Sequence, residues 1–171
     1  LAWQRVVIVM VTIATFLALD VLVRATRMGR QIRAVSQNIE CCAVNGIDVF
    51  RIFDAMNDVR NLRVAIEAVK AAGKHAQGTI CYTTSPVHTT AAFVEQAKAM
   101  AAMGVDSIAI KDMAGLLTPY ATGDLVKALK EALSLPVVIH SHDTAGLASM
   151  CQMKAIENGA DRIDTAISSF A

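Results

Sequence analysis

The 171 residues of the chain fit a single domain of ordinary size, and 16 basic against 15 acidic residues leave a formal net charge of only +1. So small a charge creates no extended positive field, which argues against a nucleic-acid partner. Hydrophobic residues make up 54% of the chain. This share is high for a purely soluble domain and indicates that one segment needs burial beyond an ordinary core.

The most apolar segment is Val6–Val23, which reads VVIVMVTIATFLALDVLV. About eighteen apolar residues are enough for a transmembrane helix, although the charge of Asp20 interrupts the run near its end. The arginines that follow would lie on the cytoplasmic side of a membrane. We therefore expect a cytoplasmic location for the rest of the chain, at the inner face of the membrane. A buried strand or helix of a soluble protein is the alternative interpretation of the same residues.

The next segment, residues 24–48, reads RATRMGRQIRAVSQNIECCAVNGID. It resembles the permease subunits of branched-chain amino-acid ABC transporters, in which a membrane helix leads into a basic segment of this kind that docks on the ATPase subunit. Only one membrane span of that family is present, so the resemblance implies a membrane-anchored fragment and no transport pathway. We expect residues 1–45 to form an apolar helix followed by a basic segment.

From residue 46 onward a unit of strand and helix recurs, marked by Gly-X-Asp triplets that begin at residues 46, 104 and 159. Helices should end at these glycines, because glycine accepts the positive φ that turns the chain into the next strand. We expect strands near residues 49–54, 77–83, 107–111, 137–142 and 162–166, and helices near 59–72, 90–103, 123–133 and 147–158. Such alternation implies parallel strands in either a barrel or an open doubly wound sheet. No GxGxxG or GxxxxGK[ST] follows any strand, so a nucleotide-binding open sheet has little support.

Polar side chains gather where the expected strands end, which in a barrel is the side of the active site. The candidates there are Asp54, Thr83, Lys111, Asp112, His140, His142, Asp143 and Asp164. His140 and His142 are two residues apart on one strand and project to the same side, which offers two imidazoles to one metal ion. Lys111 ends the preceding strand. An ammonium group has no lone pair, so Lys111 is a metal ligand only if CO₂ carbamylates it. Pairing with Asp112 or binding a substrate anion is an equally good interpretation.

Five stretches of residues 46–171 match one known family, namely VFRIFDAMNDVRN, GTICYTTSPVHT, IAIKDMAGLLTPY, HSHDTAGLASM and DTAISS. They closely resemble the carboxyltransferase barrel of biotin-dependent enzymes. Among these enzymes, YTTSPVHT is more similar to the oxaloacetate decarboxylase alpha subunit and to the separate carboxyltransferase subunit of two-subunit pyruvate carboxylases than to single-chain pyruvate carboxylase. The resemblance implies that residues 46–171 form a partial (β/α)8 TIM barrel, strands four to eight of the family barrel.

The resemblance also implies a site and its chemistry. In this family an aspartate of the first strand, a carbamylated lysine and two histidines hold a divalent metal, commonly zinc, manganese or cobalt. Lys111, His140 and His142 match the last three, and Lys111 and Asp54 are the catalytic candidates. The expected function is carboxyl transfer between oxaloacetate or pyruvate and biotin, which is carried on another domain or subunit. The metal would orient and polarise the keto acid during this transfer.

A complete barrel of this kind needs about 250 residues, so we expect an incomplete enzyme. The first three strands, the aspartate ligand and the threonine that the family uses as proton shuttle are missing, and the chain alone is expected to be inactive. A partner chain or an oligomer would have to supply the missing strands. Two other functions remain as alternatives: a membrane-anchored permease-like fragment, and a non-catalytic chimera of two unrelated genes that meet at residues 45–53.

Overall fold

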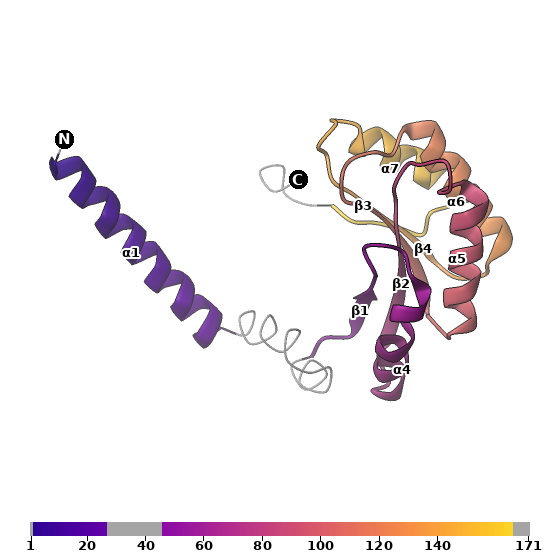
Figure 1. Cartoon of the computed structure of the whole chain (residues 1–171), viewed down its shortest axis with the longest axis horizontal. Helices are drawn as coiled ribbons and strands as arrows, with labels where there is room; N and C mark the ends of the chain where they lie inside the picture. The colour runs from indigo at the N-terminus through magenta and orange to yellow at the C-terminus, as the bar shows by residue number, and fades with distance from the viewer. Residues whose placement is uncertain (1, 27–45, 166–171) are drawn as a thin grey trace. The chain divides into compact units, whose positions relative to one another are not determined.

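The computed structural model describes residues 2–26 and 46–165, and the chain divides into two compact units, residues 1–48 and 49–171. In the first unit, α1 is a 24-residue α-helix over Ala2–Ala25 (Figure 1). The expected helix is therefore confirmed. The expected membrane span at Val6–Val23 is not supported, because no helix within the described ranges is long and apolar enough to cross a membrane. Most of the basic, permease-like segment falls at residues 27–45, outside the described residues.

The second unit is built on one sheet of five parallel strands, β1 to β5, that lie side by side in chain order. They span Val49–Ile52, His75–Cys81, Ser107–Asp112, Val137–Ser141 and Arg162–Ile163. In a doubly wound sheet the strand order reverses at a switch point, whereas a barrel places each new strand beside the previous one. The uninterrupted order confirms the expected partial (β/α)8 barrel.

Helices connect the strands and cover one face of this sheet. They are η1 (Val59–Asn61), α4 (Arg63–Ala71), α5 (Thr90–Ala102), α6 (Pro119–Ala132) and α7 (Ala148–Glu157). Contacts join α4 to β1 and β2, α5 to β2, and α6 and α7 to β4. Figure 1 shows α5 and α6 next to each other on one side of the strands. The sheet therefore has one face toward helices and one face toward the barrel interior.

The predicted start of α6 is wrong. The helix expected to begin at residue 123 begins at Pro119, because the side chain of Thr118 caps it by accepting a hydrogen bond from the backbone N–H of Ala121. Proline at the first helical position is compatible with this start, since the N–H that it lacks has no partner within the helix.

Strand alternation separates an apolar face from a polar one. A Cβ atom added at Gly78 would lie 2.9 Å from Sδ of Met100 on α5, so this residue faces the helices. The residues that share its face on β2, β3 and β4 are buried and apolar, namely Ala76, Ile80, Ile108, Ile110, Val137 and Ile139. The intervening residues face the interior, and many are polar, namely Gln77, Thr79, Ser107, Lys111 and His140. Burial of the first set supplies the core, and the second set includes the predicted site residues Lys111 and His140.

The aspartates of two Gly-X-Asp triplets make the same pair of contacts at the amino ends of the strands. Asp106 accepts a hydrogen bond from the backbone N–H of Ala76 at the start of β2, at 2.8 Å. Asp161 accepts one from Val137 at the start of β4, at 2.7 Å. Each aspartate also pairs with a lysine near the end of the helix that leads into that strand. These contacts lie at the end of the barrel opposite to the expected active site, so their role is stability.

Candidate metal-binding site

One row of interior side chains crosses three neighbouring strands near their carboxyl ends. Cys81 is the register partner of Lys111, and Lys111 is the register partner of His140. The pairing of β4 with β5 continues this row to Asp164, which directly follows β5. Residues in register on parallel strands point to the same face. The fold therefore brings together Lys111, His140 and Asp164, which are up to 53 residues apart in sequence.

The two histidines are neighbours, as the strand alternation predicts. The ring centroids of His140 and His142 are 5.2 Å apart, with the ring planes at 66°. With metal–nitrogen bonds of about 2.0–2.1 Å, two imidazoles that share one tetrahedral ion have ring centroids roughly 5 Å apart. The spacing of the pair thus fits joint ligation of one metal ion.

Asp164 contacts His140 at the Nδ1 atom of its ring. Its Oδ2 atom lies 2.9 Å from Nδ1 of His140 and accepts a second hydrogen bond from the guanidinium of Arg51 at 2.6 Å. Burial raises the pKa of this carboxyl, but the hydrogen bonds from Arg51 and His140 outweigh that effect and the pKa is lowered. Asp164 is consequently a carboxylate at neutral pH.

Lys111 extends across the interior face toward the end of β1. Its Nζ atom lies 3.9 Å from the centroid of the Phe53 ring, which is a cation–π contact. Burial raises the pKa of the neighbouring Cys81 thiol, although the charge of Lys111 acts in the opposite direction. Cys81 is therefore a protonated thiol and a poor nucleophile.

Asp54, the second catalytic candidate, directs its carboxylate to the loop that follows β1. One carboxylate oxygen accepts hydrogen bonds from the backbone N–H groups of Met56 and Asp58, both at 3.0 Å. The other accepts one from the side chain of Asn61 at 3.1 Å. The backbone hydrogen bond from Asp58 and the bond from Asn61 lower the pKa of Asp54. A carboxyl of low pKa is a weak general base near neutral pH, so this geometry favours a loop-forming role for Asp54.

Two further aspartates at strand ends also organise loops. Asp112 is fully buried and accepts hydrogen bonds from the backbone of the loop that follows β3. Asp143 accepts one from the backbone N–H of Ala148 at the start of α7, at 2.9 Å. Thr83 is half-buried two residues beyond β2. None of these three joins the row of Lys111, His140 and Asp164 through a contact that the structure describes.

The ligand set is incomplete as it stands. Within residues 2–26 and 46–165, no group of three or more histidine, cysteine, aspartate or glutamate side chains could hold a metal ion. His140 and His142 supply two nitrogen ligands, and Lys111 supplies a third ligand only after carbamylation, since an ammonium group has no lone pair. The predicted ligands are thus adjacent, and their role as ligands stays a prediction.

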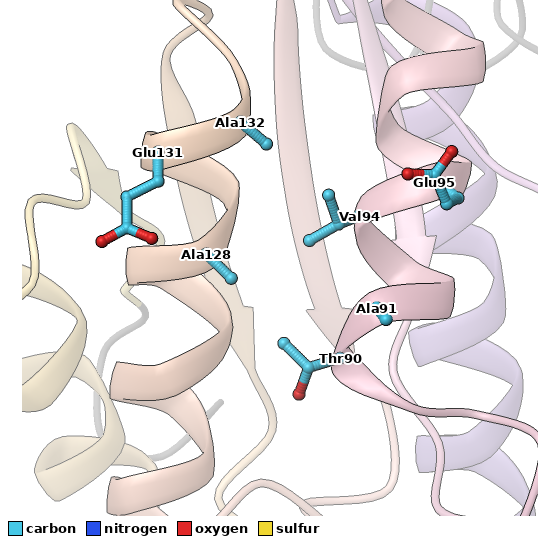
Figure 2. A pocket seen from close by; sticks show the side chains of 7 residues that line it. All are labelled: Thr90, Ala91, Val94, Glu95, Ala128, Glu131 and Ala132. Carbon is cyan, nitrogen blue, oxygen red and sulfur yellow. The ribbon is translucent and has the colours of Figure 1, made fainter.

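An open groove of about 440 Å³ lies on the other face of the unit, between α5 and α6. Figure 2 shows its lining, which comes from the two helices and is mostly small or acidic: Thr90, Ala91, Val94, Glu95, Ala128, Glu131 and Ala132. Because the helices cover the outer face of the sheet, this groove is separate from the row of interior residues. It offers no histidine or lysine for the predicted chemistry.

Sequence reasoning missed the interior network that Arg51, Gln77 and Ser107 form. Arg51 on β1 donates to Oε1 of Gln77 at 2.6 Å as well as to Asp164. Its position in the middle of VFRIF, an otherwise apolar strand, is the signal that could have identified it. A charged residue there must find a partner on the face to which it points.

The comparisons with known proteins relate the second unit to one family. A family model described as HMGL-like matches residues 51–169. A pyruvate carboxylase subunit from Methanocaldococcus jannaschii is 62% identical over 127 residues, which are 74% of this chain and 22% of that protein. The methylmalonyl-CoA carboxyltransferase 5S subunit of Propionibacterium freudenreichii subsp. shermanii is 52% identical over 139 residues, 80% of this chain and 28% of that protein.

A solved structure of a carboxyl transferase domain is also similar to this chain. The carboxyl transferase domain from Rhizobium etli pyruvate carboxylase, determined with pyruvate and biocytin, is similar with a TM-score of 0.73 and 39% identity over 75% of this chain and 23% of that one. The chain thus spans less than a third of the length of these proteins. Since the family model matches from residue 51 onward, it does not bear on the permease-like residues 24–48. Because it matches well over half of the 171 residues, the chain belongs to the HMGL-like family.

Proposed function

We propose that the chain is part of a biotin-dependent carboxyltransferase that moves a carboxyl group between biotin and a 2-oxo acid of the pyruvate and oxaloacetate type. The observation that carries the proposal is the adjacency of Lys111, His140 and His142 at the carboxyl ends of barrel strands. The names of the relatives support the reaction class, and the Rhizobium etli domain was solved with pyruvate and biocytin. Biotin would be carried on another domain or subunit.

In this proposal His140 and His142 hold a divalent metal such as zinc, manganese or cobalt. When bound, the ion would act as a Lewis acid and polarise the carbonyl group of the keto acid. The residues of this chain bind and orient the ion: His142 is exposed and accessible, and His140 is half-buried and fixed by Asp164. The remaining ligands would be a carbamylated Lys111 and an aspartate of a further strand.

Carbamylation of Lys111 forms a bond between Nζ of the neutral amine and the carbon of CO₂, and one proton is released. The product is an anionic carboxylate whose oxygen can ligate a metal. The charge on the lysine changes from positive to negative, so the contact with the Phe53 ring at 3.9 Å would be lost in favour of the metal. Asp54 would shape the loop after β1 and take no proton.

The membrane-anchored, permease-like fragment remains a weaker alternative, resting only on residues 24–48 of the sequence. No contact in the described part of the chain favours it. The location that goes with the main proposal is the cytoplasm.

The proposal is tested by metal content and by ¹³CO₂ labelling of the full chain. Purified protein dialysed with zinc or cobalt and labelled bicarbonate should bind about one ion per chain and show a carbamate carbon signal. His140→Ala should lose the ion, and Lys111→Ala should lose the carbamate signal. Lys127→Ala, which removes an exposed lysine of α6, is the control and should lose neither. A wild-type chain that is folded yet binds no metal would refute the proposed site.

A further inference from the structure

We propose that Asp164, itself held by Arg51, is the positioning residue that fixes the tautomer and ring orientation of His140. The Nε2 lone pair of His140 is then directed away from Asp164 and is available to a metal ion. The use of that lone pair rests on the proposed function, whereas the orientation of the ring does not.

The backbone of Asp164 is fixed relative to the histidine strand. Its N–H group donates to the carbonyl of Ile139 on β4 at 2.9 Å, and its own carbonyl accepts from the side chain of Gln152 on α7 at 3.0 Å. Both anchors belong to elements adjacent to His140. The carboxylate is therefore delivered to Nδ1 by regular structure and does not depend on a loose loop.

The protonation of the pair follows from its charges. Oδ2 of Asp164 accepts a hydrogen bond from the guanidinium of Arg51, and a carboxylate can only accept hydrogen bonds. The 2.9 Å contact with Nδ1 of His140 consequently requires a proton on that nitrogen. A neutral imidazole carries only one N–H group, so Nε2 must hold the lone pair. This is the arrangement by which carboxylates orient histidine ligands of metals.

Arg51 keeps the carboxylate in place from the far side of the interior. Its guanidinium donates to Oδ2 of Asp164 and, through Nε, to Gln77, both at 2.6 Å. Gln77 in turn donates to the Oγ atom of Ser107 at 3.1 Å. Gln77 is 4% exposed and Ser107 is 2% exposed. A guanidinium tied to buried partners cannot swing away easily, so the carboxylate has one preferred position.

The test compares Asp164→Ala with Asp161→Ala in the full chain. Asp161 lies three residues earlier and binds Lys130 and the backbone N–H of Val137 at the start of β4. Its substitution therefore removes an ion pair and a hydrogen bond, as in Asp164→Ala, but leaves the contacts of His140 unchanged. Two-dimensional ¹H–¹⁵N spectra that report the protonation of histidine ring nitrogens are recorded at neutral pH without metal, and His140→Gln assigns the signal. Zinc affinity is then measured by competition with a chromophoric chelator.

Wild type and Asp161→Ala should show His140 with the proton on Nδ1, and Asp164→Ala should shift the proton toward Nε2. Zinc affinity should fall about 10–100-fold in Asp164→Ala only. Arg51→Lys should give an intermediate loss. An unchanged tautomer, or unchanged zinc affinity, in a folded Asp164→Ala would overturn the inference. If the tautomer shifts as expected but wild type binds no zinc, the positioning role of Asp164 is supported and the proposed metal site is refuted.

Discussion

Asp112 offers the sharpest test of how the loop beside the site is held. This last residue of β3 is 0% exposed, and its two carboxylate oxygens accept hydrogen bonds from separate backbone groups. Oδ1 accepts from the N–H of Leu116 at 2.9 Å, and Oδ2 accepts from Leu117 at 2.8 Å. The loop after β3 is thus closed onto the residue that follows Lys111.

The expected losses differ between two substitutions. Hydrogen bonds to charged groups contribute about 1.5–3 kcal/mol each. Asp112→Asn retains one oxygen acceptor, but its amide NH₂ faces the second backbone donor. The free energy of unfolding should therefore fall by about 1.5–3 kcal/mol. Asp112→Ala leaves both buried N–H groups without the carboxylate and should lose about 3–5 kcal/mol. Domains of this size have a free energy of unfolding of only about 5–15 kcal/mol. Either substitution would therefore remove a large fraction of the stability.

The assay is urea unfolding of the full chain, followed by far-UV circular dichroism at constant pH. Asp124→Asn makes the same chemical change on the exposed side of α6 and should alter the free energy of unfolding by less than about 0.5 kcal/mol. An Asp112→Asn variant as stable as this control would refute the reasoning. Asp112→Ala should also be less stable than Asp112→Asn, and the reverse order would contradict the hydrogen-bond account.

Three further predictions concern packing, pH and ligation. Gly78→Ala should destabilise the fold by about 1–3 kcal/mol through overpacking, because the new Cβ would lie 2.9 Å from Sδ of Met100; a raised or unchanged urea midpoint would contradict this. The pKa of Asp161 is lowered by the backbone hydrogen bond from Val137 and then by Lys130. Asp161 therefore stabilises the fold above its pKa in the unfolded state, about 3.9, and this stabilisation is lost as pH falls through its pKa in the folded state. Urea midpoints at pH 7 and pH 3 should therefore differ less in Asp161→Asn than in wild type. His142→Ala, at an exposed position, should keep the unfolding midpoint and lower zinc affinity, and equal affinity would exclude His142 as a ligand.

The regular structure is largely predictable from local pattern. Four of the five predicted strands begin at the observed residue, because glycine stops and apolar runs mark these boundaries directly. The start of α6 differs because Gly123 resembles a boundary, although Thr118 followed by proline is itself a helix-start signal. Glycine in a helix signals close packing as well as an end: Gly123 is buried in α6, where an added Cβ would lie 2.9 Å from the side chain of Asn158.

The site is predictable only in part. Strand alternation is sufficient to place His140 beside His142, since both project from the end of one strand. The aspartates at strand ends look alike in sequence, yet Asp54 and Asp112 bind N–H groups of their own loops and Asp164 binds His140. That difference depends on which donors the folded backbone brings within reach. Local spacing holds no such information for partners that are many residues apart.

The strand order also bears on how the protein folds. Each strand pairs with the one that precedes it in the chain, so the sheet can grow stepwise with short loop closures, and contacts of this kind favour rapid folding. The bond between Arg51 and Asp164 is different, because it joins residues 113 positions apart. It can form only after the fifth strand has docked. A chain that folds from its N-terminus during synthesis would therefore complete its core first, and the orientation of His140 would be among the last features of the native state to appear.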